Sequence, residues 1–78
     1  MQLCYLTGEV IHVLDHVEVE GSMRGVVVAV IDSDEYSEGF SREHWGHYRK
    51  GVLVDTLEIG VVFYQDPAHI LEFKKLTG

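Results

Sequence analysis

The fold of this chain is decided by residues 16–31, HVEVEGSMRGVVVAVI. At its start, Val17 and Val19 point to one face of an extended chain and the intervening polar side chains point to the other. This alternation predicts a half-buried strand. The segment 21–25, GSMRG, is bracketed by two glycines and predicts a turn. The run Val26–Ile31 is apolar on both faces and rich in β-branched residues, which is typical of a central strand.

Apolar segments on both sides of this pair predict further strands. They are Leu3–Leu6 and Val10–Val13, which would pair as a hairpin, and then Val52–Leu57, Ile59–Gln65 and Ile70–Leu76. Asp66 before Pro67 predicts a tight turn ahead of the last segment, because proline fixes φ and has no backbone donor. In that last segment, Leu71 and Phe73 are expected on one face of a strand.

The order of these segments predicts an all-β fold in a single domain that covers residues 1–78. Short strands joined by tight turns and one long loop are typical of a small closed barrel, which leaves no exposed sheet edge. A single turn before the last strand is a feature of SH3-like barrels. The specific prediction is therefore a five-stranded SH3-like barrel, with an N-terminal hairpin strand and one short helical turn in the long loop.

The composition limits the classes of function. The formal net charge is −7, from 13 carboxylates against six lysines and arginines. This balance opposes binding to nucleic acid or to an anionic membrane, because such binding depends on neutralising phosphates. Cys4 is the only cysteine, so no internal disulfide can form, and a reducing, cytoplasmic setting is expected. The N-terminus lacks the features of a signal peptide, and no apolar run reaches the ~18 residues of a membrane span.

The long loop, residues 32–51, is named here the connector, and it is the predicted binding site. It contains four of the eight aromatic residues and three of the six lysines and arginines. Aromatic side chains mixed with arginine are typical of binding hot spots. The candidate binding residues are Tyr36, Phe40, Arg42, Trp45, Tyr48 and Arg49.

The connector residues are expected to divide between two roles. If the connector folds back over one mouth of the barrel, Phe40 and Trp45 would complete the core, since a small protein needs large side chains there. Tyr36 and Tyr48, each with a polar tip, are the better surface candidates. Ser41 is placed to cap a short helix that contains Trp45.

Other chemistries have weaker sequence support. His44 with His47, or Cys4 with His12 and His16, lack a convincing full ligand set, so neither a metal nor another cofactor is expected. Asp32, Asp34 and Glu43 fit three positions of a calcium-binding loop, but the obligatory glycine is replaced by a serine. No nucleophile elbow, phosphate-binding loop or dinucleotide motif is present, so an enzyme is not expected.

The sequence resembles two groups of proteins. The pattern RGVVVAVID, EYSEGF, a tryptophan, a tyrosine and GVLV resembles a group of short uncharacterised bacterial proteins. More distantly, the chain is similar to the YccV-like hemimethylated-DNA-binding family of small heat-shock proteins. The matching positions are Gly25, Val26, Val27, Asp32, Glu35, Tyr36, Trp45 and Tyr64. That resemblance implies an SH3-like barrel that binds DNA or a protease, although this chain has a shorter loop and an acidic composition.

The function expected from the sequence is that of a non-enzymatic protein-binding module, which engages another protein through the connector. One alternative is a YccV-like regulator that binds nucleic acid or a protease. Another is an acidic inhibitor or immunity protein that mimics a polyanion. Binding of the polyanion type should weaken steeply with added salt, whereas binding in an aromatic groove should not.

Overall fold

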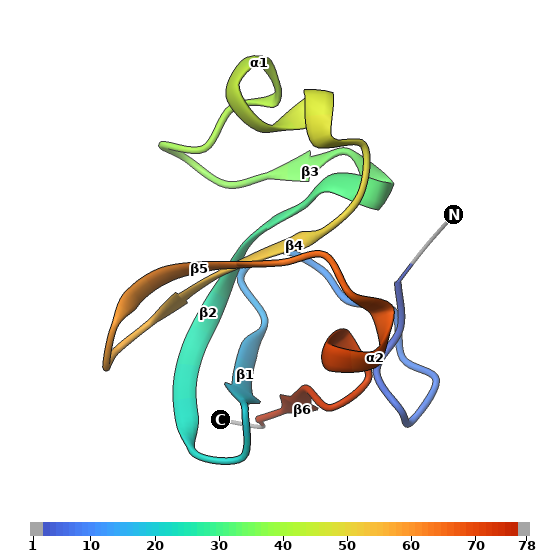
Figure 1. Ribbon diagram of the computed structural model, residues 1–78, viewed down its shortest axis with the longest axis vertical. Coiled ribbons are helices and arrows are strands. Elements are labelled where there is room, and N and C mark those ends of the chain that lie inside the picture. The colour runs from blue at the N-terminus through green and yellow to red at the C-terminus, as the bar shows by residue number, and fades with distance from the viewer. Residues whose placement is uncertain (1–2, 77–78) are drawn as a thin grey trace.

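The computed structural model describes residues 3–76, and most of its regular structure is β-strand (Figure 1). The strands are β1 (His16–Val19), β2 (Met23–Val30), β3 (Glu35–Tyr36), β4 (Val52–Thr56), β5 (Gly60–Tyr64) and β6 (Lys74–Lys75). The helices are α1 (Arg42–Trp45) and α2 (Pro67–Ile70), and single 3-10 turns lie at Ile31–Ser33 and Gly46–Tyr48. The predicted all-β class is confirmed.

All strands belong to one antiparallel sheet with the order β5-β4-β2-β1-β6, and β3 pairs separately with the end of β2. This sheet is open, because within residues 3–76 no backbone pairing joins β5 to β6. The closed barrel expected from the sequence is therefore not formed. β6 is only two residues long, and the chain between β5 and β6 is occupied by α2, so little strand is left to close the sheet.

The centre of the sheet follows the sequence pattern. Val17 and Val19 are buried on β1, as their alternation predicts. The turn between β1 and β2 is tighter than expected, because Glu20 and Gly21 both have positive φ and this geometry suits a hairpin. Met23 therefore already pairs with Val19 as part of β2.

Both ends of the chain differ from the strands expected there. The N-terminal segment is paired only briefly. Cys4 and Val10 form one antiparallel bridge, and the N–H groups of Tyr5 and Ile11 donate to the carbonyl oxygens of Glu9 and Leu3, so the predicted hairpin is present but short. At the other end, α2 begins with Asp66 as its cap, where the sequence predicted a tight turn. Leu71 follows α2 as its C-cap residue and is 48% exposed, while Phe73 is buried. Leu71 and Phe73 therefore do not share the face of a strand.

The main core lies on the inner face of the curved sheet, and α2 and the N-terminal segment help to cover it. Its buried members are Tyr5, Ile11, Val17, Val19, Val27, Val30, Val52, Val54, Tyr64, Ile70 and Phe73. In Figure 1, α2 and β6 lie on one side of β4 and β5, and β3 and α1 lie on the other side. The connector is thus separated from the main core by the sheet itself.

None of the helices among residues 3–76 has the length and apolar character needed to cross a membrane.

Candidate functional site

A β-bulge in β2 creates the surface on which the connector packs. Val27 pairs with Val54 and Ala29 pairs with Leu53, so Val28 is an extra residue without a partner on β4. A bulge of this kind lets two successive side chains face the same side of a sheet. Val28 and Ala29 accordingly join Leu53 in a second buried cluster, apart from the main core.

Three connector aromatics cover this second cluster. Tyr36, Phe40 and Trp45 are half-buried and pack against it, together with Phe63 of β5. The connector therefore folds back, as the sequence suggested, but onto the outer face of the sheet. The expected position over a barrel mouth is wrong, because the bulge supplies an apolar outer face and the sheet does not close.

Hydrogen bonds hold the connector in this position. The backbone N–H and the hydroxyl of Ser37 both donate to the carbonyl oxygen of Val28, at 3.0 and 2.9 Å. At the base of the connector, the Gly51 N–H donates to Asp32 Oδ1 at 2.7 Å. Ser41 caps α1 by accepting a hydrogen bond from the N–H of His44 at 3.3 Å, which confirms the predicted cap. The connector is consequently an ordered, packed segment.

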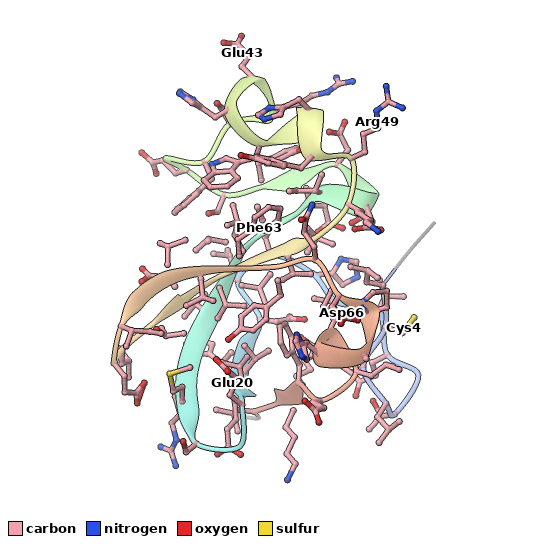
Figure 2. The ribbon with its side chains drawn as sticks, viewed as in Figure 1. Cys4, Glu20, Glu43, Arg49, Phe63 and Asp66 are labelled. Carbon is pink, nitrogen blue, oxygen red and sulfur yellow. The ribbon has the colours of Figure 1, made fainter. Side chains whose placement is uncertain are left out.

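An aromatic cluster forms where the connector meets β5, and it consists of Trp45, Tyr48 and Phe63. The Trp45 and Phe63 rings lie edge to face with centroids 5.6 Å apart, and Tyr48 and Phe63 do so at 5.0 Å. The Trp45 and Tyr48 centroids are 5.7 Å apart. These separations are those of favourable aromatic pairs. In Figure 2, the Phe63 side chain lies between β5 and the connector.

Tyr48 is the exposed member of the aromatic cluster. Its residue is 43% exposed, whereas Trp45 and Phe63 are half-buried. The ring of His47 lies against Tyr48, with centroids 4.1 Å apart. One ring is therefore presented to solvent on a platform of others, in a position to contact another molecule.

The two arginines of the predicted site have different surroundings. Arg42 Nε lies 3.4 Å from Asp34 Oδ1, so its charge is partly balanced within the connector. Arg49 is exposed and forms no ion pair with any residue between 3 and 76, and the same holds for Lys50. Figure 2 shows Arg49 pointing away from the fold at the end that carries the connector. Arg49 and Lys50 directly follow Tyr48, so the exposed ring is accompanied by two cations.

Tyr36 is less accessible than the sequence suggested. It pairs with Ala29 as part of β3 and is half-buried. Burial raises the pKa of the Tyr36 hydroxyl, and the nearby carboxylate of Asp34 raises it further. Tyr36 therefore supports the connector more than it presents a free surface.

The structure adds one residue to the site that the sequence analysis did not select, which is Phe63. The signal was present in the alternation of β5, since Val62 and Tyr64 face the core and Val61 and Phe63 must then face outward. An outward phenylalanine beside an aromatic loop indicates a contact between the two. With β5 interpreted as a strand of a closed barrel, the contact of Phe63 with the connector was not predicted.

Other hydrogen-bonded groups have structural roles. The Tyr5 hydroxyl donates to Asp15 Oδ2 at 2.7 Å, and the Tyr64 hydroxyl donates to Glu20 Oε2 at 2.8 Å. Burial, together with the carboxylate partner, raises the pKa of Tyr64 to about 12 and also raises the pKa of Tyr5. Each bond fixes the polar tip of a buried ring, as such rings require.

Several of the candidate metal ligands contact other groups of the protein. His12 Nδ1 lies 3.1 Å from both carboxylate oxygens of Glu35, and His44 Nδ1 lies 3.2 Å from the Ser41 hydroxyl. Of the possible calcium ligands, Asp32 and Asp34 bind Gly51 and Arg42 as described above. In the part of the chain that is described, no three histidine, cysteine, aspartate or glutamate side chains gather as a metal-binding group.

Comparison of the chain with models of protein families, with curated proteins and with solved structures finds no match. The function is therefore inferred from the geometry of the site.

Proposed function

We propose that this protein is a non-enzymatic protein-binding module whose contact surface is the connector and the adjoining part of β5. The observation that carries the proposal is Tyr48, an exposed ring on an ordered aromatic platform beside Arg49 and Lys50. Tyrosine and arginine are enriched in binding hot spots, because they combine a large contact area with polar groups. A rigid platform also lowers the entropy lost on binding.

The proposal includes an SH3-like architecture in a cytoplasmic protein. Its support is the strand order β6-β1-β2-β4-β5, with the single turn of α2 placed before the last strand. The lone Cys4 is compatible with a reducing compartment. In this architecture the connector is the longest loop, and long loops on rigid sheets frequently carry binding residues.

The proposal is tested by affinity capture with the immobilised protein, followed by mass spectrometry of the bound proteins. The site variant is Tyr48→Ala, and the matched control is Leu71→Ala, which removes a similarly exposed apolar side chain outside the connector. We expect one or a few proteins to be captured by the wild type and by Leu71→Ala, and to be lost with Tyr48→Ala. Capture that is unchanged by Tyr48→Ala would contradict the proposed surface.

A direct measurement then separates the alternatives. Binding of a captured protein by this surface should weaken only modestly with salt, since the apolar contacts are not screened and only Arg49 and Lys50 contribute charge. A steep loss of affinity between low and physiological salt would instead favour mimicry of a polyanion by this acidic chain.

A further inference from the structure

The two edges of the sheet differ in how they are protected. The edge strand β6 has only two residues, and both are lysines. Short edge strands and edge lysines are features that keep a sheet from pairing with other chains. The opposite edge strand, β5, has five residues, none of them charged.

β5 has the composition of an interior strand. The run Ile59–Gln65 has no charged residue, in a chain in which 24% of residues are charged. An uncharged run of equal length, Gly25–Ile31, forms most of β2, which has sheet neighbours on both sides. A strand with this composition on an open edge is expected to have a partner strand.

Exposed apolar side chains also lie on β5 and in the turn that precedes it. β4 is the one sheet neighbour of β5, and between residues 3 and 76 no other strand takes up its second edge. Leu57 is 84% exposed, Ile59 is 64% exposed and Val61 is 46% exposed. Figure 1 shows the β4–β5 hairpin projecting from the rest of the molecule, so that this edge is accessible.

We propose that β5 pairs antiparallel with β5 of a second copy of this chain, about a two-fold axis at Val62. An antiparallel strand pair can be self-complementary, which is the requirement of a two-fold interface. An axis at Val62 pairs all five residues of the strand. It also places Val61 of each copy opposite Phe63 of the other, so that the aromatic cluster of each copy covers an exposed valine.

The absence of charge on β5 limits the repulsion between two copies at this edge. Two chains of net charge −7 repel one another, and like charges placed opposite each other destabilise a strand pair. β5 has no carboxylate and no cation, so pairing two copies of this strand places no like charges opposite each other.

The small contact area of a single strand pair predicts a weak dimer. A stable interface of standard size buries about 800 Å² on each partner. Five residues of strand span only ~17 Å, so the pairing depends on side-chain contacts across it, of which the contact of Val61 with Phe63 is the largest expected. A dissociation constant in the micromolar range is therefore expected. The proposal does not rest on a binding role of the connector, because it concerns the backbone edge of β5, although Phe63 belongs both to the aromatic cluster and to the proposed dimer contact.

Sedimentation equilibrium of the purified chain over a wide range of concentrations tests the proposal. We expect the mass to rise from 8.8 kDa toward twice that value. Val61→Lys should weaken the association by at least about tenfold, because lysine on an edge strand opposes pairing. The control Leu71→Lys adds the same charge at a site of similar exposure, 48% against 46%, and should change the association by less than about twofold.

A second measurement does not depend on a variant. In a mixture of labelled and unlabelled wild-type chains, intermolecular nuclear Overhauser effects should join Val61 of one copy to Phe63 of the other. A chain that stays monomeric at millimolar concentration, or a dimer that forms equally well with Val61→Lys and shows no such contacts, would overturn the proposal.

Discussion

At the scale of single residues, the aromatic side chains of the connector divide according to how much of each ring the sheet covers. Trp45 packs on the second buried cluster and on Phe63, whereas Tyr48 contacts Phe63 and is partly exposed to solvent. The sequence indicated that the aromatic residues of the connector would form the candidate site. It could not assign the buried and exposed members, because that depends on the outer face created by the bulge at Val28.

Trp45→Ala and Tyr48→Ala are expected to differ in stability. Trp45→Ala should lower the free energy of unfolding by about 2 kcal/mol, below the 3–5 kcal/mol of a fully buried ring, because Trp45 is half-buried. Tyr48→Ala should cost less than about 1 kcal/mol, as exposed positions generally do. Urea unfolding followed by far-ultraviolet circular dichroism measures both. Equal losses of unfolding free energy for the two variants would contradict the assignment of Trp45 as the covered ring and Tyr48 as the exposed ring.

Glu35 should make the stability depend on pH. Burial alone would raise its pKa, but hydrogen bonds from His12, Ser33 and the Val13 N–H together hold the pKa below its ordinary value of 4.5. The unfolded chain thus binds a proton at higher pH than the folded chain. The stabilisation is therefore complete above about pH 4.5 and is lost as pH falls through the folded-state pKa.

Glu35→Gln provides the test of this linkage. The difference in unfolding free energy between wild type and Glu35→Gln should be present at neutral pH and should shrink below about pH 4.5. Glu38→Gln removes an exposed carboxylate for which no hydrogen bond or ion pair is found within residues 3–76, and it should show no such dependence. A difference for Glu35→Gln that is constant with pH would exclude the proposed cause.

At the scale of elements, the sequence predicted the interior of the sheet better than its ends. The alternation in β1 and the apolar run in β2 specify their positions, since a shift of one residue would expose buried valines. The last strand is shorter than predicted, because Asp66 and Pro67 start a helical turn that includes Ile70 and ends at Leu71. The bulge in β2 leaves no clear mark in a run of similar apolar residues, so the outer cluster was not foreseen.

The connection between the connector and β4 should be sensitive to substitution at Gly51. Gly51 has a φ of +127°, and an added Cβ would meet the Phe63 ring and lie 2.9 Å from the Tyr64 carbonyl oxygen. Gly39 also has positive φ, at +89°, but an added Cβ there meets nothing within 4 Å. Both alanine variants should suffer backbone strain of about 1–3 kcal/mol.

Only Gly51→Ala should also disturb packing. We expect it to be less stable than Gly39→Ala by at least about 1 kcal/mol, the typical lower cost of overpacking. It should also alter the near-ultraviolet circular dichroism of the aromatic cluster. Similar stability and similar spectra for the two variants would show that Gly51 does not approach Phe63 closely.

At the scale of the whole molecule, charge and topology together define what the protein can contact. The acidic balance was evident from composition. The open edge at β5 was not, because the succession of strands favoured a closed barrel, and closure depends on how long the last strand is. The connector and β5 meet at Phe63, so the proposed binding surface and the proposed dimer edge are adjacent.

Duplex DNA should not bind at physiological salt. The formal charge of −7 opposes association with phosphates, and among the exposed cations only Arg49 and Lys50 lie side by side on the connector. A gel-shift titration with micromolar protein measures this. A shift that weakens steeply as salt is added would favour the alternative of a YccV-like regulator.

The most direct test of the central claim, that the connector is held on the outer face of the sheet with Tyr48 exposed, is a nuclear Overhauser spectrum of the wild-type protein. The indole of Trp45 should show contacts to the Phe63 ring and to side chains of the second cluster, Val28, Ala29 and Leu53, as expected for rings 5.6 Å apart and for packing on that cluster. Absence of both sets of contacts in the folded protein would mean that the connector does not pack on β4 and β5. In that case the aromatic platform beneath Tyr48 would not exist.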